Sequence, residues 1–209
     1  MILYFVRHGE TEWNVRKKIQ GATDIPLNDH GREQAQKLAA YLKKERKAGR
    51  FSAGCVYTSP QRRAAQTAQT VADALLIPCV PLDGIREMKM GDWEGLNWRT
   101  VKQRYRESYE SWNADRRYVR TPNGESYNDL LKRTFDAISE ILDREQEREN
   151  VLVVSHSAVL MAVRCYLDGY SFEEDNMVGR YKTKNTEVVA IQAEDLMNAR
   201  KRFYDELAE

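Results

Sequence analysis

Two short apolar runs lie far apart in the chain, and each ends at a histidine. The first, Ile2 to Val6, leads into Arg7-His8-Gly9, and the second, Val151 to Val154, leads into Ser155-His156-Ser157. Wholly apolar runs of this length are typical of strands buried on both faces of a sheet. Ligands of open α/β sheets bind outside the carboxyl ends of the strands. We therefore expect both histidines to lie on one rim of such a sheet.

Other segments complete an alternating pattern of strands and helices. A strand is expected at Cys55 to Tyr57, before a helix from about Gln61, and a last strand at Val188 to Gln192. Strands that alternate with helices predict an α/β fold, a three-layer αβα sandwich with a mostly parallel central sheet. Helical spacing of apolar residues is seen at Ala35, Leu38, Ala39 and Leu42, at Leu131, Phe135, Ile138 and Leu142, and at Leu196, Ala199, Phe203 and Leu207.

The length of 209 residues suits one domain. No repeat, proline-rich linker or low-complexity tract divides the chain, so we expect a single domain over residues 1–209. The segment 90–123, rich in Trp, Tyr and Arg, is the least regular part. We expect it to overhang the rim as a cap.

Charge and cysteine content limit the classes of partner and the cellular compartment that we expect for this chain. The 33 basic and 32 acidic side chains nearly cancel, so we expect neither a nucleic-acid partner nor a membrane. Cys55, Cys79 and Cys165 lack zinc spacing and suit free thiols in a reducing compartment. The apolar start is too short for a signal peptide, and no run reaches membrane-spanning length. A cytoplasmic protein is expected, and the sequence leaves a homodimer open.

His8 stands out among the three histidines because of its neighbours. A lone histidine at a strand end is more often a structural hydrogen-bonding residue than a catalyst. Here Arg7 precedes it, and Gly9 would let a ligand approach the backbone closely. Thr11 and Asn14 follow as neutral donors for an oxyanion. This grouping indicates an anion site at the end of the first strand.

A series of short motifs connects the two histidines. It opens with Val6-Arg7-His8-Gly9-Glu10-Thr11-Glu12-Trp13-Asn14, and it continues through Gln20-Gly21, Asp24-Ile25-Pro26-Leu27, Gly31 with Gln34-Ala35, Ser59-Pro60-Gln61-Arg62-Arg63-Ala64-Ala65-Gln66-Thr67-Ala68, Arg86-Glu87, Gly91-Asp92-Trp93-Glu94-Gly95, Gly124-Glu125-Ser126 and Val154-Ser155-His156. In content and order these motifs resemble the histidine phosphatase superfamily, whose best-known relatives are the cofactor-dependent phosphoglycerate mutases. The resemblance implies a phosphoglycerate mutase-like fold.

The resemblance also implies roles for single residues. By position, His8 takes the phosphoryl group, while Arg7, Arg63 and His156 bind its oxygens. Fixed cations aimed at these oxygens stabilise the charge that spreads over them during transfer. Glu87 holds the position of the carboxyl that protonates the leaving alkoxide and then activates water.

Further residues are weaker candidates. Asn14 is expected to add a phosphate contact. Glu12, Glu94 and Glu125 are as suited to holding loops as to contacting substrate, and His30 suits a solvated or capping position. Two positions depart from the family pattern: Ser157 stands where glycine is common, and Gln61 where leucine is common. A serine still offers its backbone N–H to phosphate, so the chemistry is expected to survive.

The resemblance favours a metal-independent phosphomonoester hydrolase that forms a phosphohistidine and acts on a small phosphorylated metabolite, with no cofactor and no metal. A phosphoglycerate mutase is the alternative, disfavoured because 90–123 is shorter than the corresponding mutase insertion. A non-catalytic binder of phosphorylated ligands would need neither His8 nor Glu87. The sequence does not identify the substrate, and Arg116, Arg117 and Arg120 suit either an acidic group on it or a solvated charge run.

Overall fold

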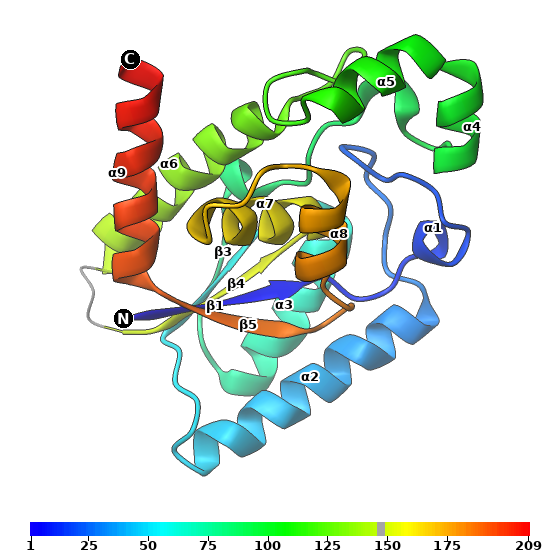
Figure 1. Ribbon diagram of the computed structural model, residues 1–209. Coiled ribbons are helices and arrows are strands. Elements are labelled where there is room, and N and C mark those ends of the chain that lie inside the picture. Colours follow the sequence, from blue (N-terminus) through cyan, green and yellow to red (C-terminus); the bar gives the residue numbers. More distant parts are fainter. Residues whose placement is uncertain (146–148) are drawn as a thin grey trace.

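The computed structural model describes residues 1–145 and 149–209. At its centre is a five-stranded sheet with the order β3-β2-β4-β1-β5 (Figure 1). Neighbouring strands are parallel except for β5, which runs antiparallel to β1. The strands are β1 (Ile2–Arg7), β2 (Cys55–Thr58), β3 (Cys79–Pro81), β4 (Val151–Ser155) and β5 (Val188–Gln192). The predicted α/β class with a mostly parallel sheet is confirmed.

Helices cover both faces of the sheet. Val6 and Val154 pack into an apolar core with residues of α2 and α3, whereas Phe5 and Val153 point into the other core, with α6, α7 and α9. Alternate side chains of a strand point to opposite faces, so this division gives the predicted three layers. The helices are α1 (Glu12–Val15), α2 (Asp29–Lys47), α3 (Arg62–Leu75), α4 (Trp98–Arg104), α5 (Arg106–Ala114), α6 (Tyr127–Glu145), α7 (Ser157–Leu167), α8 (Glu174–Tyr181) and α9 (Ala193–Ala208), with 3₁₀ turns η1 (Asp83–Ile85) and η2 (Gly91–Trp93).

The apolar patterns locate the long helices correctly. In α2 the residues at helical spacing, from Ala35 to Leu42, are buried, and in α6 those from Leu131 to Leu142 are too. The Asn28 side chain caps the start of α2 by accepting a hydrogen bond from the Gly31 N–H at 2.7 Å. Burial of one apolar stripe against the sheet therefore explains why these segments are helical.

The register brings the three central strands to a common end. Arg7 in β1 pairs with Ser155 in β4, and Thr58 in β2 pairs with Val154. The pairing continues past the strands, because the His8 N–H donates to the Ser155 carbonyl at 3.0 Å. The loops that follow β1, β2 and β4 therefore meet on one rim, as the two strand-end histidines led us to expect.

The segment 90–123 is more regular than the sequence indicated. It contains η2, α4 and α5, and the two helices lie together at the upper right of Figure 1. Its apolar positions are filled mainly by aromatic residues, and Trp93 and Trp112 are buried. Both helices are short, so no long apolar repeat revealed them. The role of this segment as a cap stays a prediction.

The cysteines are unpaired. Cys55 and Cys165 are buried and Cys79 is half-buried. Burial raises the pKa of the Cys55 and Cys165 thiols to about 11, which keeps both protonated at neutral pH. Along the two described stretches of chain, the helices lack the combined length and apolarity needed to cross a bilayer.

Candidate active site

The two strand-end histidines meet on the rim. His8 follows β1 and His156 follows β4, and their ring centroids lie 5.2 Å apart. Both side chains are almost fully shielded from solvent. The adjacent parallel strands place them side by side, although 148 positions separate them in the sequence.

The hydrogen bonds of His8 define which ring nitrogen is available. Nδ1 lies 2.7 Å from the Gly9 carbonyl oxygen. Because a carbonyl only accepts, Nδ1 must carry the proton, and the lone pair is then on Nε2. Burial, followed by the positive charges of Arg63 and Arg7, holds the pKa of His8 well below its ordinary value. The ring is therefore neutral at pH 7, with Nε2 free to act as a nucleophile.

Gly9 lets the loop after β1 pack closely on its neighbours, and its role in ligand approach stays a prediction. A Cβ on Gly9 would lie 2.6 Å from the Gly31 carbonyl oxygen, and a Cβ on Gly31 would lie 2.0 Å from the Glu10 carbonyl oxygen. The loop after β1 thus packs directly on the start of α2. The Gly9 N–H donates to the Thr67 hydroxyl at 3.0 Å, which holds this loop on α3 as well.

Two guanidinium groups, from the half-buried Arg7 and the fully buried Arg63, lie close enough to His8 to lower its pKa. Arg7 Nη1 donates to the Thr183 carbonyl at 2.7 Å, and Arg63 donates to the carbonyls of Thr23 and Gly21 at 2.8 and 2.9 Å. Backbone carbonyls hold both groups without neutralising them. Burial lowers the pKa of each arginine, and Glu87 opposes this shift. A positively charged site results, which we call the pocket.

Three buried nitrogens in this pocket have no hydrogen-bond partner in the described structure. They are Nε of Arg7, Nε of Arg63 and Nδ1 of His156. His156 Nε2 lies 2.8 Å from the Ser59 hydroxyl, and burial and Arg63 hold the pKa of His156 well below its usual value. When the hydroxyl donates to Nε2, Nδ1 carries the proton of the neutral ring. Unpartnered buried donors are costly, so the pocket is prepared for an anion.

Glu87 extends from the segment between β3 and η2 to the same place. Its Oε1 accepts hydrogen bonds from the N–H groups of Met88 at 2.9 Å and Ala158, in the first turn of α7, at 3.2 Å. Burial raises the pKa of Glu87, and the charges of Arg63 and Arg7 oppose that effect. A carboxyl with a raised pKa suits a proton donor.

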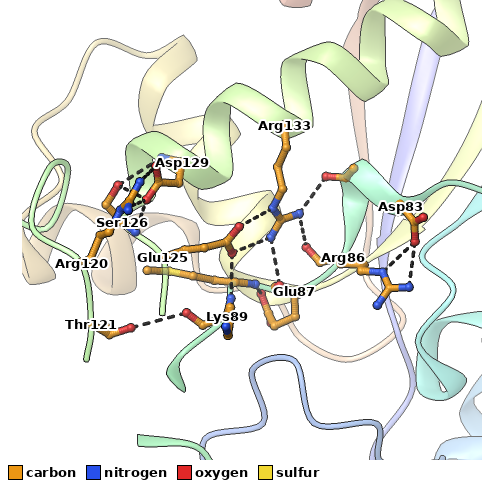
Figure 2. A network of polar contacts seen from close by, with 12 residues as sticks. Asp83, Arg86, Glu87, Lys89, Arg120, Thr121, Glu125, Ser126, Asp129 and Arg133 are labelled. Carbon is orange, nitrogen blue, oxygen red and sulfur yellow. Dashed lines mark hydrogen bonds and ion pairs between the residues drawn. The ribbon is translucent and has the colours of Figure 1, made fainter. Parts of the chain in front are cut away.

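Polar contacts fix the backbone around Glu87. Arg133 of α6 donates to the carbonyls of Gly84, Arg86 and Glu87 at 2.8 to 3.0 Å (Figure 2). The same guanidinium forms a bidentate ion pair with Glu125, with N–O distances of 2.8 and 2.9 Å. Glu125, one of the weaker candidates, therefore holds a loop.

The other side-chain candidates have structural contacts. Asn14 Oδ1 accepts from the Thr11 backbone N–H at 3.0 Å, within a capping box at α1. Glu94 accepts from the N–H groups of Ala22 and Thr23, in the loop that binds Arg63. Thus Glu94 holds that loop, and the phosphate contact of Asn14 stays a prediction.

Two further candidates lie at the surface. Glu12 forms an ion pair with Arg16 at 2.8 Å. The His30 side chain is also exposed, 3.9 Å from Glu33. His30 is solvated and does not cap α2, because Asn28 caps it. The structure therefore brings five of the six main candidates together, while the contacts of Asn14 are those of the cap of α1.

Sequence reasoning missed three supporting residues. Gln61 is buried; its Oε1 accepts from the Glu87 N–H at 2.8 Å, and its Nε2 donates to the Gly21 carbonyl at 3.0 Å. Asn185 Nδ2 donates to the His8 carbonyl at 2.7 Å, and the Thr183 carbonyl accepts a hydrogen bond from Arg7 Nη1. Gln61 had a sequence signal, because it departs from the family pattern. No sequence signal identified Thr183 or Asn185, which lie in the loop before β5.

Metal-ligating side chains do not gather in the described parts of the chain, where no group of three or more His, Cys, Asp or Glu could hold an ion. The positive charge beside His8 comes from the protein itself, through Arg7 and Arg63. These groups have the geometry to bind the oxygens of a phosphoryl group. What the arrangement can do is transfer that group to Nε2 of His8.

Comparison with known proteins gives one family. The model of the histidine phosphatase superfamily (branch 1) matches residues 3–205. Phosphoglycerate mutase-like protein 4 of Arabidopsis thaliana is 37% identical over 164 residues, which cover 76% of this chain and 67% of that protein. The uncharacterized phosphatase PhoE of Bacillus subtilis is 34% identical over 164 residues, 78% of this chain and 76% of that protein. The solved structure of Bacillus stearothermophilus YhfR superposes with a TM-score of 0.79 at 31% identity, covering 91% and 90% of the two chains.

Proposed function

Because this chain belongs to the histidine phosphatase superfamily, we propose that it hydrolyses small phosphomonoesters through a phosphohistidine at His8. The observation that carries the proposal is the state of His8: a buried neutral ring, anchored through Nδ1, with a free Nε2 beside unpartnered donors. A phosphatase among its relatives, PhoE of Bacillus subtilis, supports the same reaction.

The first chemical step transfers the phosphoryl group to the protein. The Nε2 lone pair of His8 forms a bond to phosphorus while the ester P–O bond breaks, and the electron pair of that bond stays on the leaving oxygen. Glu87 donates its proton to this oxygen, so an alcohol departs. Arg7, Arg63 and His156 bind the three other oxygens, on which negative charge is spread in the transition state.

The second step returns His8 to its resting state. A water molecule attacks phosphorus, the P–N bond breaks, and its electron pair returns to Nε2. Glu87, now a carboxylate, takes the proton of the attacking water. One carboxyl thus serves as acid and then as base, and the cycle ends with the starting protonation states.

Hydrolysis is favoured over phosphoglycerate mutase activity because the segment 90–123 is short and the B. subtilis relative is a phosphatase. A turnover screen over a panel of phosphomonoesters, with 3-phosphoglycerate under mutase conditions, tests this choice. Phosphate release from several esters supports the proposal. Conversion of 3-phosphoglycerate to its 2-isomer at a higher rate than any phosphate release would contradict it. A non-catalytic binder would release no phosphate.

We expect activity to survive exhaustive chelation. The charges of Arg7 and Arg63 already lie at the pocket, so no divalent ion is needed to neutralise the phosphoryl oxygens. Vanadate should inhibit at low concentration, because it adopts the five-coordinate geometry of the transfer. The measurement is turnover before and after chelation, with vanadate titrated into the chelated enzyme. Restoration of a chelated, inactive enzyme by magnesium would overturn the metal-free mechanism.

Phosphorylation by an alkyl phosphate should decline on the alkaline side as Glu87 loses its proton. Burial raises the pKa of Glu87, so its acid form persists to higher pH than that of an ordinary glutamate. His8 is already neutral there, because its pKa is lowered. The measurement is the ratio of the wild-type rate to the Glu87→Gln rate as a function of pH, because the ionisation of the substrate affects both rates equally and cancels. A ratio that does not change with pH would show that Glu87 is not the general acid.

The free cysteines support a reducing compartment, and we place the protein in the cytoplasm. Burial protects Cys55 and Cys165 from oxidation, and Cys79 is partly exposed. Cell fractionation tests this location, with a thiol-reactive reagent applied before lysis to label the cysteines that are free in the cell. Recovery in a membrane or secreted fraction would contradict it.

A further inference from the structure

A cavity of about 350 Å³ opens beside the start of α7. Ser157 and Met161 of α7 form its inner wall, and residues of α4 and α5 face them, including Trp98, Lys102 and Trp112. Lys182, just after α8, closes another side. Two larger cavities lie along α9, and neither is lined by a sequence neighbour of the phosphate-site residues, whereas Ser157 of this cavity directly follows His156.

The cavity adjoins the point at which the leaving group departs. Ser157 directly follows His156, and the next N–H, that of Ala158, donates to Oε1 of Glu87 at 3.2 Å. The carboxyl that protonates the leaving oxygen is therefore held at the first turn of α7. Ser157, which lines the cavity, therefore lies between the phosphate site and the cavity along the chain.

One wall is a stacked aromatic platform. The rings of Trp98 and Trp112 are stacked, with centroids 5.7 Å apart and planes at 17°. Trp93 packs edge-on against both, at 6.1 and 5.4 Å. Trp112 is only 2% exposed, whereas Trp98 is 42% exposed. The buried rings thus fix Trp98 while it offers an apolar surface to a planar ligand at low entropic cost.

The lining also carries positive charge. Lys102 Nζ lies 5.0 Å from the centroid of the Tyr109 ring. Lys182 is exposed at the rim. Among the described residues, no acidic side chain lines this cavity. Its local field therefore favours an anionic group, although the whole protein is nearly neutral.

We propose that this cavity holds the leaving group of the substrate, and that this group is an alcohol with an aromatic or other planar ring and a second negative charge. The inference rests on the proposed phosphatase function and specifies its substrate class. The ring lies against Trp98, and the anionic group lies between Lys102 and Lys182. The phosphate oxygens remain with Arg7 and Arg63.

Three primary alkyl phosphates separate these contributions: ethyl phosphate, 2-phenylethyl phosphate and 2-(4-carboxyphenyl)ethyl phosphate. Their leaving oxygens are chemically similar, so differences in kcat/KM report the cavity. We expect the ring to raise kcat/KM about tenfold or more, as burial against aromatic side chains does. The carboxylate should add about a further threefold, and that gain should fall as salt screens the two lysines.

Variants of the cavity residues test which of them produces each gain in kcat/KM. Trp98→Ala should reduce the ratio of kcat/KM for 2-phenylethyl phosphate to kcat/KM for ethyl phosphate toward one. Lys102→Gln with Lys182→Gln should remove the carboxylate gain and its salt dependence while the ring ratio persists. Tyr41→Ala and Lys37→Gln, on the exposed side of α2, are matched controls that should leave both ratios unchanged.

The outcomes distinguish this inference from the function on which it rests. If ethyl phosphate is hydrolysed but neither ring nor carboxylate raises kcat/KM, the cavity assignment is overturned and the phosphatase stands. Gains that persist in the Trp98 and lysine variants would also overturn the assignment. Failure to hydrolyse any of the three esters or 4-nitrophenyl phosphate would overturn the proposed function and the inference with it.

Discussion

Glu87→Gln should slow phosphorylation of His8 by an alkyl phosphate by about a hundredfold or more, the range typical of general acid catalysis. An alkoxide needs a proton as the P–O bond breaks. Glutamine keeps the size of the side chain, and its amide oxygen can still accept from the N–H groups of Met88 and Ala158. It cannot deliver the proton. The loss therefore reports chemistry rather than position.

The leaving group provides the decisive comparison. A nitrophenolate departs without protonation, so phosphorylation by nitrophenyl phosphate should slow far less in Glu87→Gln. The measurement is the single-turnover first step, because the later attack by water suffers equally for both substrates. Glu12→Gln is the matched control, since Glu12 is exposed and paired with Arg16. Equal losses for both substrates would show that Glu87 serves binding or architecture.

His8→Ala should lower turnover by about a thousandfold or more, the scale of loss on removing a nucleophile. The proposed nucleophile, Nε2 of His8, is lost, while Arg7, Arg63 and His156 keep their own contacts. Steady-state turnover and thermal unfolding should be measured together, because His8 is buried and its removal changes the packing as well as the chemistry. His30→Ala, at an exposed histidine, should retain full activity. A folded His8→Ala protein with substantial turnover would contradict the mechanism.

Much of the fold follows from patterns that burial imposes on sequence. The runs before His8 and His156 are apolar because both faces of β1 and β4 are covered, and α2 and α6 show one buried stripe each. Strand β3 escaped prediction because it has three residues, none of them fully buried. An edge strand of this kind carries no alternation that a sequence could display.

The site could be predicted only where side-chain identity matters. Arg7 and Arg63 are recognisable from the family motifs, but their anchors are the backbone carbonyls of Thr183, Thr23 and Gly21. Any residue supplies a carbonyl, so the identity of these residues does not reveal that they anchor an arginine. The bond from Asn185 to the His8 carbonyl likewise joins residues 177 positions apart and depends on the completed fold.

The phosphorylated form of His8 tests the central claim most directly. The enzyme should be mixed briefly with labelled substrate and quenched without acid, and the protein then examined for bound phosphoryl groups. The account predicts a label that is acid-labile and base-stable, as a phosphohistidine is, and that is absent from His8→Ala and present in His30→Ala. A label that persists in His8→Ala would contradict the account.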